Sequence, residues 1–259
     1  MSLDKFQDAG WDVRVKNHAD AILQQDFPSQ LHELTAISLS TAIDPSLLIE
    51  GGGGESKITQ ELRRKLEKAG WQKHKFQVHK SVDARQVASA THEIDHVNSA
   101  DVGTLVLEIE WNNKDPFFDR DLENFQRLHQ DGAASVGIVI TRGASLQDEI
   151  PAIFRECALT RGISSPPDLV EAFDVRLTEN QQRQISRQEA LGMSFVDAWA
   201  KTFSSSKFGT ATTHWSKLEE RVLRGVGNPC PLLLLGIPSS VVVGWSLNKS
   251  VNSHTPLVR

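Results

Sequence analysis

Three acidic residues, Asp95, Glu108 and Glu110, have the side chains and the spacing to bind a divalent cation. Residues 104–111 alternate strictly between two sets of side chains, which is typical of a β-strand. One set is Leu105, Leu107, Ile109 and Trp111, and the other is Val106, Glu108 and Glu110. Asp95 closes a preceding strand-like segment, and a hairpin would place it beside both glutamates. Three carboxylates on one face repel one another unless a cation lies among them, so the segment predicts a metal site.

Two points in this pattern stay open. Asp101 also precedes the glutamates, although it lies close to the expected turn. Two glutamates on one strand face are also compatible with an ordinary solvent-exposed strand, and Asp95 at the expected place argues against that. The spacing is typical of the PD-(D/E)XK nucleases, with Glu110 at the position where lysine is more usual.

The chemistry that such a site would support is phosphodiester hydrolysis. One or two Mg²⁺ ions can activate the attacking water, neutralise charge at the phosphate and assist the leaving oxygen. Asp95 and Glu108 are expected to hold the metal, while Glu110 either binds a second ion or accepts the proton of the water. Because position 110 is not a lysine, Lys114 or the basic segment 73–80 must supply positive charge. Further candidates for a supporting carboxylate are Glu55 and Glu61.

The flanking segments predict a mixed α/β scaffold. A helix capped by Ser56 carries an apolar stripe and a basic face, and a strand follows over 71–80. After the hairpin, a helix over 119–130 and a buried strand over 135–141 predict a βαβ crossover. We expect Leu122, Phe125 and Leu128 of that helix to be exposed and to form part of a dimer interface. Other predicted elements are helices over 17–50, a helical insertion at about 146–203, and apolar strands over 232–237 and 241–245.

Two polar segments are predicted to contact DNA. The loop 204–214 combines small hydroxyl side chains with one lysine and precedes a helix, whose free N–H groups favour phosphate. A second polar segment follows the acidic strand directly. The predicted DNA-binding residues are Lys207, Thr210, Thr212, Thr213, His214, Asn112, Asn113 and Lys114.

Composition limits the remaining possibilities. The chain has 259 residues, which fits one large α/β domain spanning 1–259. The net charge of −5 provides no general basic field, so DNA contact must come from a local patch. The two cysteines show no zinc-like spacing, and no signal segment or membrane-length apolar run is present. We therefore expect a cytoplasmic protein without membrane contact.

Four segments together resemble the type II restriction endonucleases of the BglII, BstYI and BamHI group. They are 17–23, 57–71, the acidic hairpin through 136–143, and 229–237. The resemblance implies a central mixed β-sheet flanked by helices, with Asp95 and Glu108 as metal carboxylates and Glu110 at the third position. It also implies one or two Mg²⁺ ions per site. The insertion at about 146–203 departs from the known members of the group.

The same resemblance implies the substrate and the assembly. The enzyme would be a homodimer that cuts both strands of a short palindromic site in double-stranded DNA and leaves 5′ overhangs. A cognate DNA methyltransferase would act on the same site without being a stable partner. Two alternatives are a repair or modification-dependent nuclease with the same core, and a non-catalytic DNA-binding protein that kept the fold. The first would need a reader domain, and the second would be expected to have lost an acidic residue.

Overall fold

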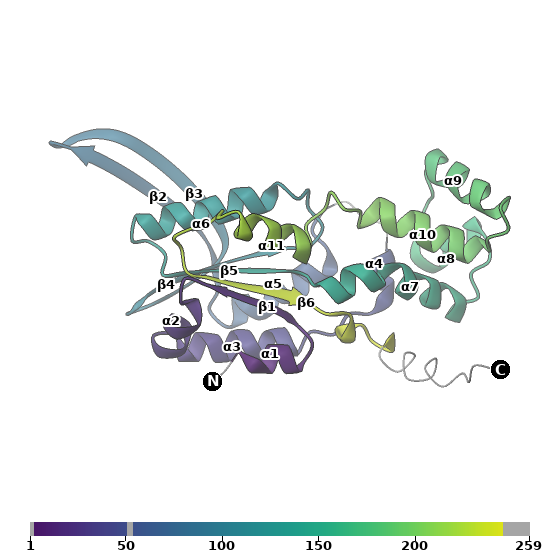
Figure 1. The fold of residues 1–259 in the computed structure, drawn as a ribbon, viewed down its shortest axis with the longest axis horizontal. Helices are drawn as coiled ribbons and strands as arrows, with labels where there is room; N and C mark the ends of the chain where they lie inside the picture. Colours follow the sequence, from purple (N-terminus) through teal and green to yellow (C-terminus); the bar gives the residue numbers. More distant parts are fainter. Residues whose placement is uncertain (1–2, 51–53, 246–259) are drawn as a thin grey trace.

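The computed structural model describes residues 3–50 and 54–245, which form a six-stranded mixed sheet flanked by helices (Figure 1). The strand order is β1-β6-β5-β4-β3-β2, with β4, β5 and β6 parallel to one another and the other pairs antiparallel. The strands are β1 (Asp12–Lys16), β2 (Gln72–Val82), β3 (Arg85–Ala100), β4 (Gly103–Glu110), β5 (Val136–Arg142) and β6 (Leu232–Ile237). This architecture confirms the predicted fold class.

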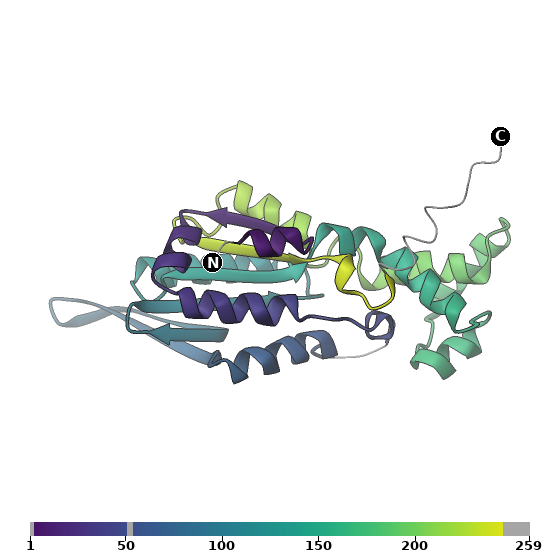
Figure 2. The ribbon, with the colours of Figure 1, turned by 90° about the horizontal axis from the view of Figure 1, so that it is seen from below.

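Helices cover both faces of the sheet (Figures 1 and 2). One face packs against α1 (Asp4–Asp8), α2 (Ala19–Gln25), α3 (Pro28–Leu39) and α5 (Lys57–Lys68). The other face packs against α6 (Phe117–Gln130) and α11 (Trp215–Leu223). Ser56 caps α5 by accepting from Thr59 N at 3.0 Å, as predicted. No helix within the described residues has the length and apolar character needed to cross a membrane.

The strand β4 divides its side chains between the two faces as its alternation predicts. Leu105, Leu107 and Ile109 are buried toward the α1–α5 layer, whereas Val106 is buried toward α6. The following α6 returns the chain so that β5 pairs in parallel with β4, which confirms the βαβ crossover. Glu108 and Glu110 therefore lie on the α6 side of the sheet.

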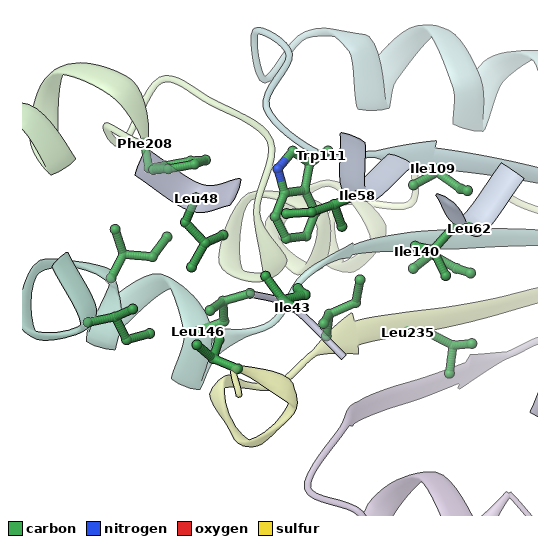
Figure 3. Packing of buried hydrophobic residues seen from close by; sticks show 14 of the residues in the cluster. Ile43, Leu48, Ile58, Leu62, Ile109, Trp111, Ile140, Leu146, Phe208 and Leu235 are labelled. Carbon is green, nitrogen blue, oxygen red and sulfur yellow. The ribbon is translucent and has the colours of Figure 1, made fainter. Parts of the chain in front are cut away.

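A helical region beyond one end of the sheet holds α7 (Ala144–Thr160), α8 (Pro166–Phe173), α9 (Glu179–Glu189) and α10 (Phe195–Lys207). Its aromatic centre is a group of rings in which Trp199 stacks on Phe154, Phe173 and Phe203. Side chains from this region and from the sheet join one buried cluster (Figure 3). The labelled members are Ile43, Leu48, Ile58, Leu62, Ile109, Trp111, Ile140, Leu146, Phe208 and Leu235. The short helix α4 (Pro45–Ile49) contributes Leu48 to it.

Three expectations about the scaffold are wrong, and one strand was missed. Residues 241–245 do not form a strand, because the chain turns through the 3-10 helix Ser239–Val241. The edge strand β1 was not predicted. The segment from Ser204 to Lys207 belongs to α10 and not to a loop. The side chains of Leu122, Phe125 and Leu128 are fully buried under α6, so they are core residues and not a dimer interface.

The contact of α6 with the sheet gives a stability prediction. Gly137 lies in β5, where a Cβ atom would stand 2.5 Å from Phe125 Cδ2 and 3.0 Å from Leu232 Cδ2. We expect Gly137→Ala to lower the free energy of unfolding by about 1–3 kcal/mol, because the ring must move. Urea denaturation measures this loss. In a double-mutant cycle Phe125→Leu should recover part of it, and simple additivity of the two changes would contradict this packing.

Candidate functional site

The acidic residues of the predicted site lie on two neighbouring strands. The register pairs His96 with Leu107, which sets Asp95 opposite Glu108. The backbone N–H of Asp95 donates to Glu108 Oε1 at 3.3 Å. Glu108 and Glu110 are almost completely buried, with 4% and 3% of their surface exposed, whereas the Asp95 side chain is 58% exposed. Asp95 lies within β3 and does not close that strand, contrary to the sequence-based expectation.

A fourth acid, Asp121, lies beside them on α6 with 1% of its surface exposed. Its carboxyl group lies against the Glu110 carboxyl, so that the two groups can share a proton only if one of them is protonated, and its Oδ1 accepts from Arg120 Nε at 2.8 Å. Asp121 was not among the predicted site residues. Its position was the available signal, because Asp121 falls in the apolar stripe of Phe118, Leu122 and Phe125 and a charge there points into the protein.

Two cationic side chains reach this group of acids. Arg120 lies 2.7 Å from Asp121 Oδ1 and 3.6 Å from Glu110 Oε1. Lys73 lies 2.6 Å from Glu93 and 3.4 Å from Asp95. Arg120 was not predicted, whereas Lys73 belongs to the basic segment that was. Both cationic side chains are more than half exposed, so they neutralise the buried acids only in part.

Burial dominates the electrostatics of the site. Loss of hydration raises the pKa of Glu108 well above its ordinary value, and the charges of Asp121 and Asp95 add to the rise. The pKa of Glu110 is raised to about 8. Burial is the largest cause, and the charge of Asp121 and its interaction with the Glu110 carboxyl raise this pKa further. The pKa of Asp121 is raised by burial as well, although Glu110 and Arg120 oppose that rise. Ionising all three buried acids together is therefore costly, because little positive charge lies near them.

A polar segment ties the end of β4 to residues 208–214. Asn113 Nδ2 donates to Glu110 Oε2 at 2.7 Å, while the Asn113 backbone N–H donates to Thr213 Oγ1 at 3.1 Å. The Thr213 N–H donates back to the Asn113 carbonyl at 2.9 Å. A bridge between Lys114 and Thr212 continues this pairing. The candidate DNA-contacting segments therefore lie together, directly next to a candidate catalytic acid.

The buried Arg142 holds these segments in place. Its guanidinium donates to Asn112 Oδ1 at 3.1 Å, to Thr212 Oγ1 at 2.8 Å and to the Thr213 carbonyl at 2.8 Å. It also lies 4.4 Å from the centre of the Phe208 ring. Burial lowers the pKa of Arg142 to about 9. Such a buried cation fixes backbone geometry, because leaving any of its partners unpaired would be costly.

The structure separates the predicted DNA-binding residues into exposed and internal ones. Asn113, Lys114 and Thr210 are exposed. Thr213 and His214 are buried, and the side chains of Asn112 and Thr212 bond to Arg142. Lys207 Nζ donates to the carbonyls of Leu48, Ile49 and Glu50 at 2.8, 3.3 and 2.6 Å, and burial lowers its pKa to about 8. In the free protein Lys207 is therefore tied to the chain itself.

The remaining candidate acids lie away from this group. Asp101 occupies the turn that joins β3 to β4, at the far end of the pair from Asp95. Glu55 and Glu61 form ion pairs with Arg63 and Lys65 on the α5 side of the sheet.

The residues of the site fit a divalent cation by their chemistry. Carboxylate oxygens are the ligands that Mg²⁺ prefers, and a cation would offset the charge that burial leaves uncompensated. Asp121 Oδ2 is buried and receives no hydrogen bond from any donor within the described chain. As the side chains stand, no three acid, histidine or cysteine groups in 3–50 and 54–245 converge closely enough to hold a metal. Binding therefore requires side-chain rotation, for which the exposed Asp95 has room.

The raised pKa of Glu110 gives a pH prediction for the cation-free protein. Between pH 4.5 and about 8 the folded state keeps a proton that the unfolded state has lost, so the free energy of unfolding falls as pH rises. Glu110→Gln cannot ionise at this position, so it loses this pH dependence. As pH rises from 5 to 8, its free energy of unfolding should therefore gain on that of the wild type, by up to about 1.4 kcal/mol per unit of pKa shift. Urea denaturation in EDTA at pH 5 and pH 8 measures the difference. Glu123→Gln on the exposed side of α6 serves as the control, and equal pH dependence in both variants would refute the prediction.

Comparison with known protein families gives one match that covers most of the chain. The family model described as Restriction endonuclease BglII/BglIII matches residues 11–237. This range contains the whole sheet and every residue of the site described above. Comparison with curated proteins gives no match.

Proposed function

Because the chain belongs to the BglII/BglIII restriction endonuclease family and is a type II restriction endonuclease, we propose that Asp95, Glu108 and Glu110 form its Mg²⁺-dependent catalytic site. The observation that carries this proposal is the excess of buried acid on the α6 face of β4. Asp95 and Glu108 would hold the cation, and Glu110 would bind a second ion or accept a proton. When bound, Mg²⁺ supplies Lewis acidity at the phosphate and lowers the pKa of an attacking water.

The protein's own groups have separate tasks in the hydrolysis. The attacking water forms a bond to phosphorus as the bond from phosphorus to the leaving oxygen breaks, and the proton of the water must go to a base. Glu110 is placed for that task once it has lost its own proton, and Asn113 holds its Oε2 in position. Arg120, 3.6 Å from Glu110 Oε1, can place positive charge near the phosphate, which position 110 does not supply because it is not a lysine.

The DNA-contacting surface is proposed to include Asn113, Lys114 and Thr210. These residues are exposed, and the pairing of 113–115 with 211–213 holds them next to Glu110. The partly buried Asn112 and Thr212 and the buried Thr213 are proposed to set the shape of this surface through Arg142, and His214 lies at the start of α11 behind it. Lys207 would reach DNA only after leaving its three carbonyl partners.

The proposed substrate is a short palindromic site in double-stranded DNA, cut in both strands to leave 5′ overhangs. A palindrome presents two equivalent half-sites, which a two-fold homodimer matches by symmetry. The apolar residues of α6 cannot form the predicted dimer interface, because they are buried against the sheet. The proposed setting is the cytoplasm, where a DNA methyltransferase would protect the same site without being a stable partner.

Loss of one metal carboxylate should stop cleavage without loss of DNA binding. We expect Glu108→Gln to lower the cleavage rate by about 100-fold or more, since transition-state charge is no longer neutralised. Plasmid cleavage with Mg²⁺ or with EDTA, followed by sequencing of the ends, measures activity and overhang together. Glu123→Gln is the matched control on the same protein. Full activity of Glu108→Gln, or undiminished cleavage in EDTA, would exclude the proposed site.

Exposed residues of the DNA surface should affect binding in two distinguishable ways. A phosphate contact by Lys114 predicts that Lys114→Ala weakens binding to all sequences and reduces the salt slope by about one unit. A base contact by Thr210 predicts a loss of about 1–3 kcal/mol at one position of the site. Lys201→Ala, which removes a lysine exposed on α10, is the charge control. Unchanged affinity, salt slope and site preference in both variants would show that this surface does not contact DNA.

A further inference from the structure

We infer that Asp121 is a fourth carboxylate of the cation site, so that the site is built from α6 as well as from β3 and β4. This inference rests on the proposed function, because it assigns a further ligand to the same cation. It adds a residue eleven positions after Glu110, outside the hairpin that carries the other three acids.

Asp121 has an unusual environment for an aspartate that merely decorates a helix. Its side chain is 99% buried, in the same row as Phe118, Leu122 and Phe125. Oδ1 is bound by Arg120, whereas Oδ2 is buried without a donor from the described residues. A buried carboxylate oxygen without a donor is costly, so a group that is absent from the free chain is expected to satisfy it.

The neighbours of Asp121 identify the chemistry of that group. Its carboxyl touches the Glu110 carboxyl, and its charge also acts on Glu108. Two buried carboxyl groups in contact require either a shared proton or a cation between them. A divalent cation satisfies both groups at once and places Asp121 and Glu110 among its ligands.

The position on α6 explains why this acid reaches the site. The crossover from β4 to β5 lays α6 over the carboxyl-terminal half of β4, and Leu122, Phe125 and Leu128 fix its rotation in the core. Asp121 therefore cannot turn outward without exposing that stripe. By contrast, Asp119 on the same helix pairs with Arg221 at 2.8 Å and is 38% exposed.

The test is cation binding by the whole protein in the absence of DNA. Mn²⁺ is titrated at pH 8.5, free Mn²⁺ is measured by electron paramagnetic resonance, and the Mn²⁺-induced rise in melting temperature is recorded in parallel. Asp121→Asn keeps the shape of the side chain and removes its charge. We expect its Mn²⁺ dissociation constant to rise by about 10–100-fold and its thermal shift to shrink accordingly. Asp119→Asn removes the same charge two residues away and should bind like the wild type.

The outcomes separate the two proposals. Wild-type-like Mn²⁺ binding by Asp121→Asn would overturn the role of Asp121 and leave the other three carboxylates in place. Equal weakening by Asp119→Asn would also overturn it, since only general charge would then matter. A wild-type protein that binds no Mn²⁺ would count against the proposed metal site itself. If Asp121→Asn does not fold, Asp121→Ser is expected to give the same weakening, and tight binding by that variant would refute the inference.

Discussion

The burial of carboxyl groups between β4 and α6 is the constraint on which the rest of the site depends. Glu108, Glu110 and Asp121 lose most of their hydration there, while Arg120 is the cation that touches two of them. An arrangement of this kind opposes folding at neutral pH, because removing charge from water costs several kcal/mol per group. The surrounding packing must offset that cost. Residues Val106, Phe118 and Phe125 form part of the buried layer that does so.

The sequence predicts the acidic strand β4 well because the alternation that defines it is local. Strict alternation in 104–111 fixes which side chains share a face, and the structure confirms that assignment. The parallel β5 follows from the crossover rule once α6 is recognised. Asp121 was not predicted, although its place in the apolar stripe of α6 indicates that its side chain points into the protein. Which acids it meets there depends on where α6 crosses β4, and alternation and spacing do not specify that.

The prediction that 204–207 form a loop was wrong because tertiary contacts override composition. A lysine among serines and threonines resembles a solvent-exposed side chain, yet Lys207 ends α10 and donates to three carbonyl groups at the end of α4. Those carbonyls lie more than 150 residues away in sequence, so no local pattern indicates the pairing. The apolar stripe of α6 shows the opposite error. Leu122, Phe125 and Leu128 were assigned to an interface, although the sheet itself covers them.

Arg142 and Asn113 connect the candidate DNA surface to the acids mechanically. Arg142 fixes Thr212 and Thr213, Thr213 pairs with Asn113, and Asn113 holds Glu110 Oε2. These hydrogen bonds measure 2.7–3.1 Å, and displacement of one partner leaves another unsatisfied. A movement of 208–214 on DNA would therefore change the hydrogen bonding of Glu110. The same contacts that give the candidate DNA surface its shape also reach Glu110 on β4, so the candidate surface and the candidate site are joined by one set of hydrogen bonds.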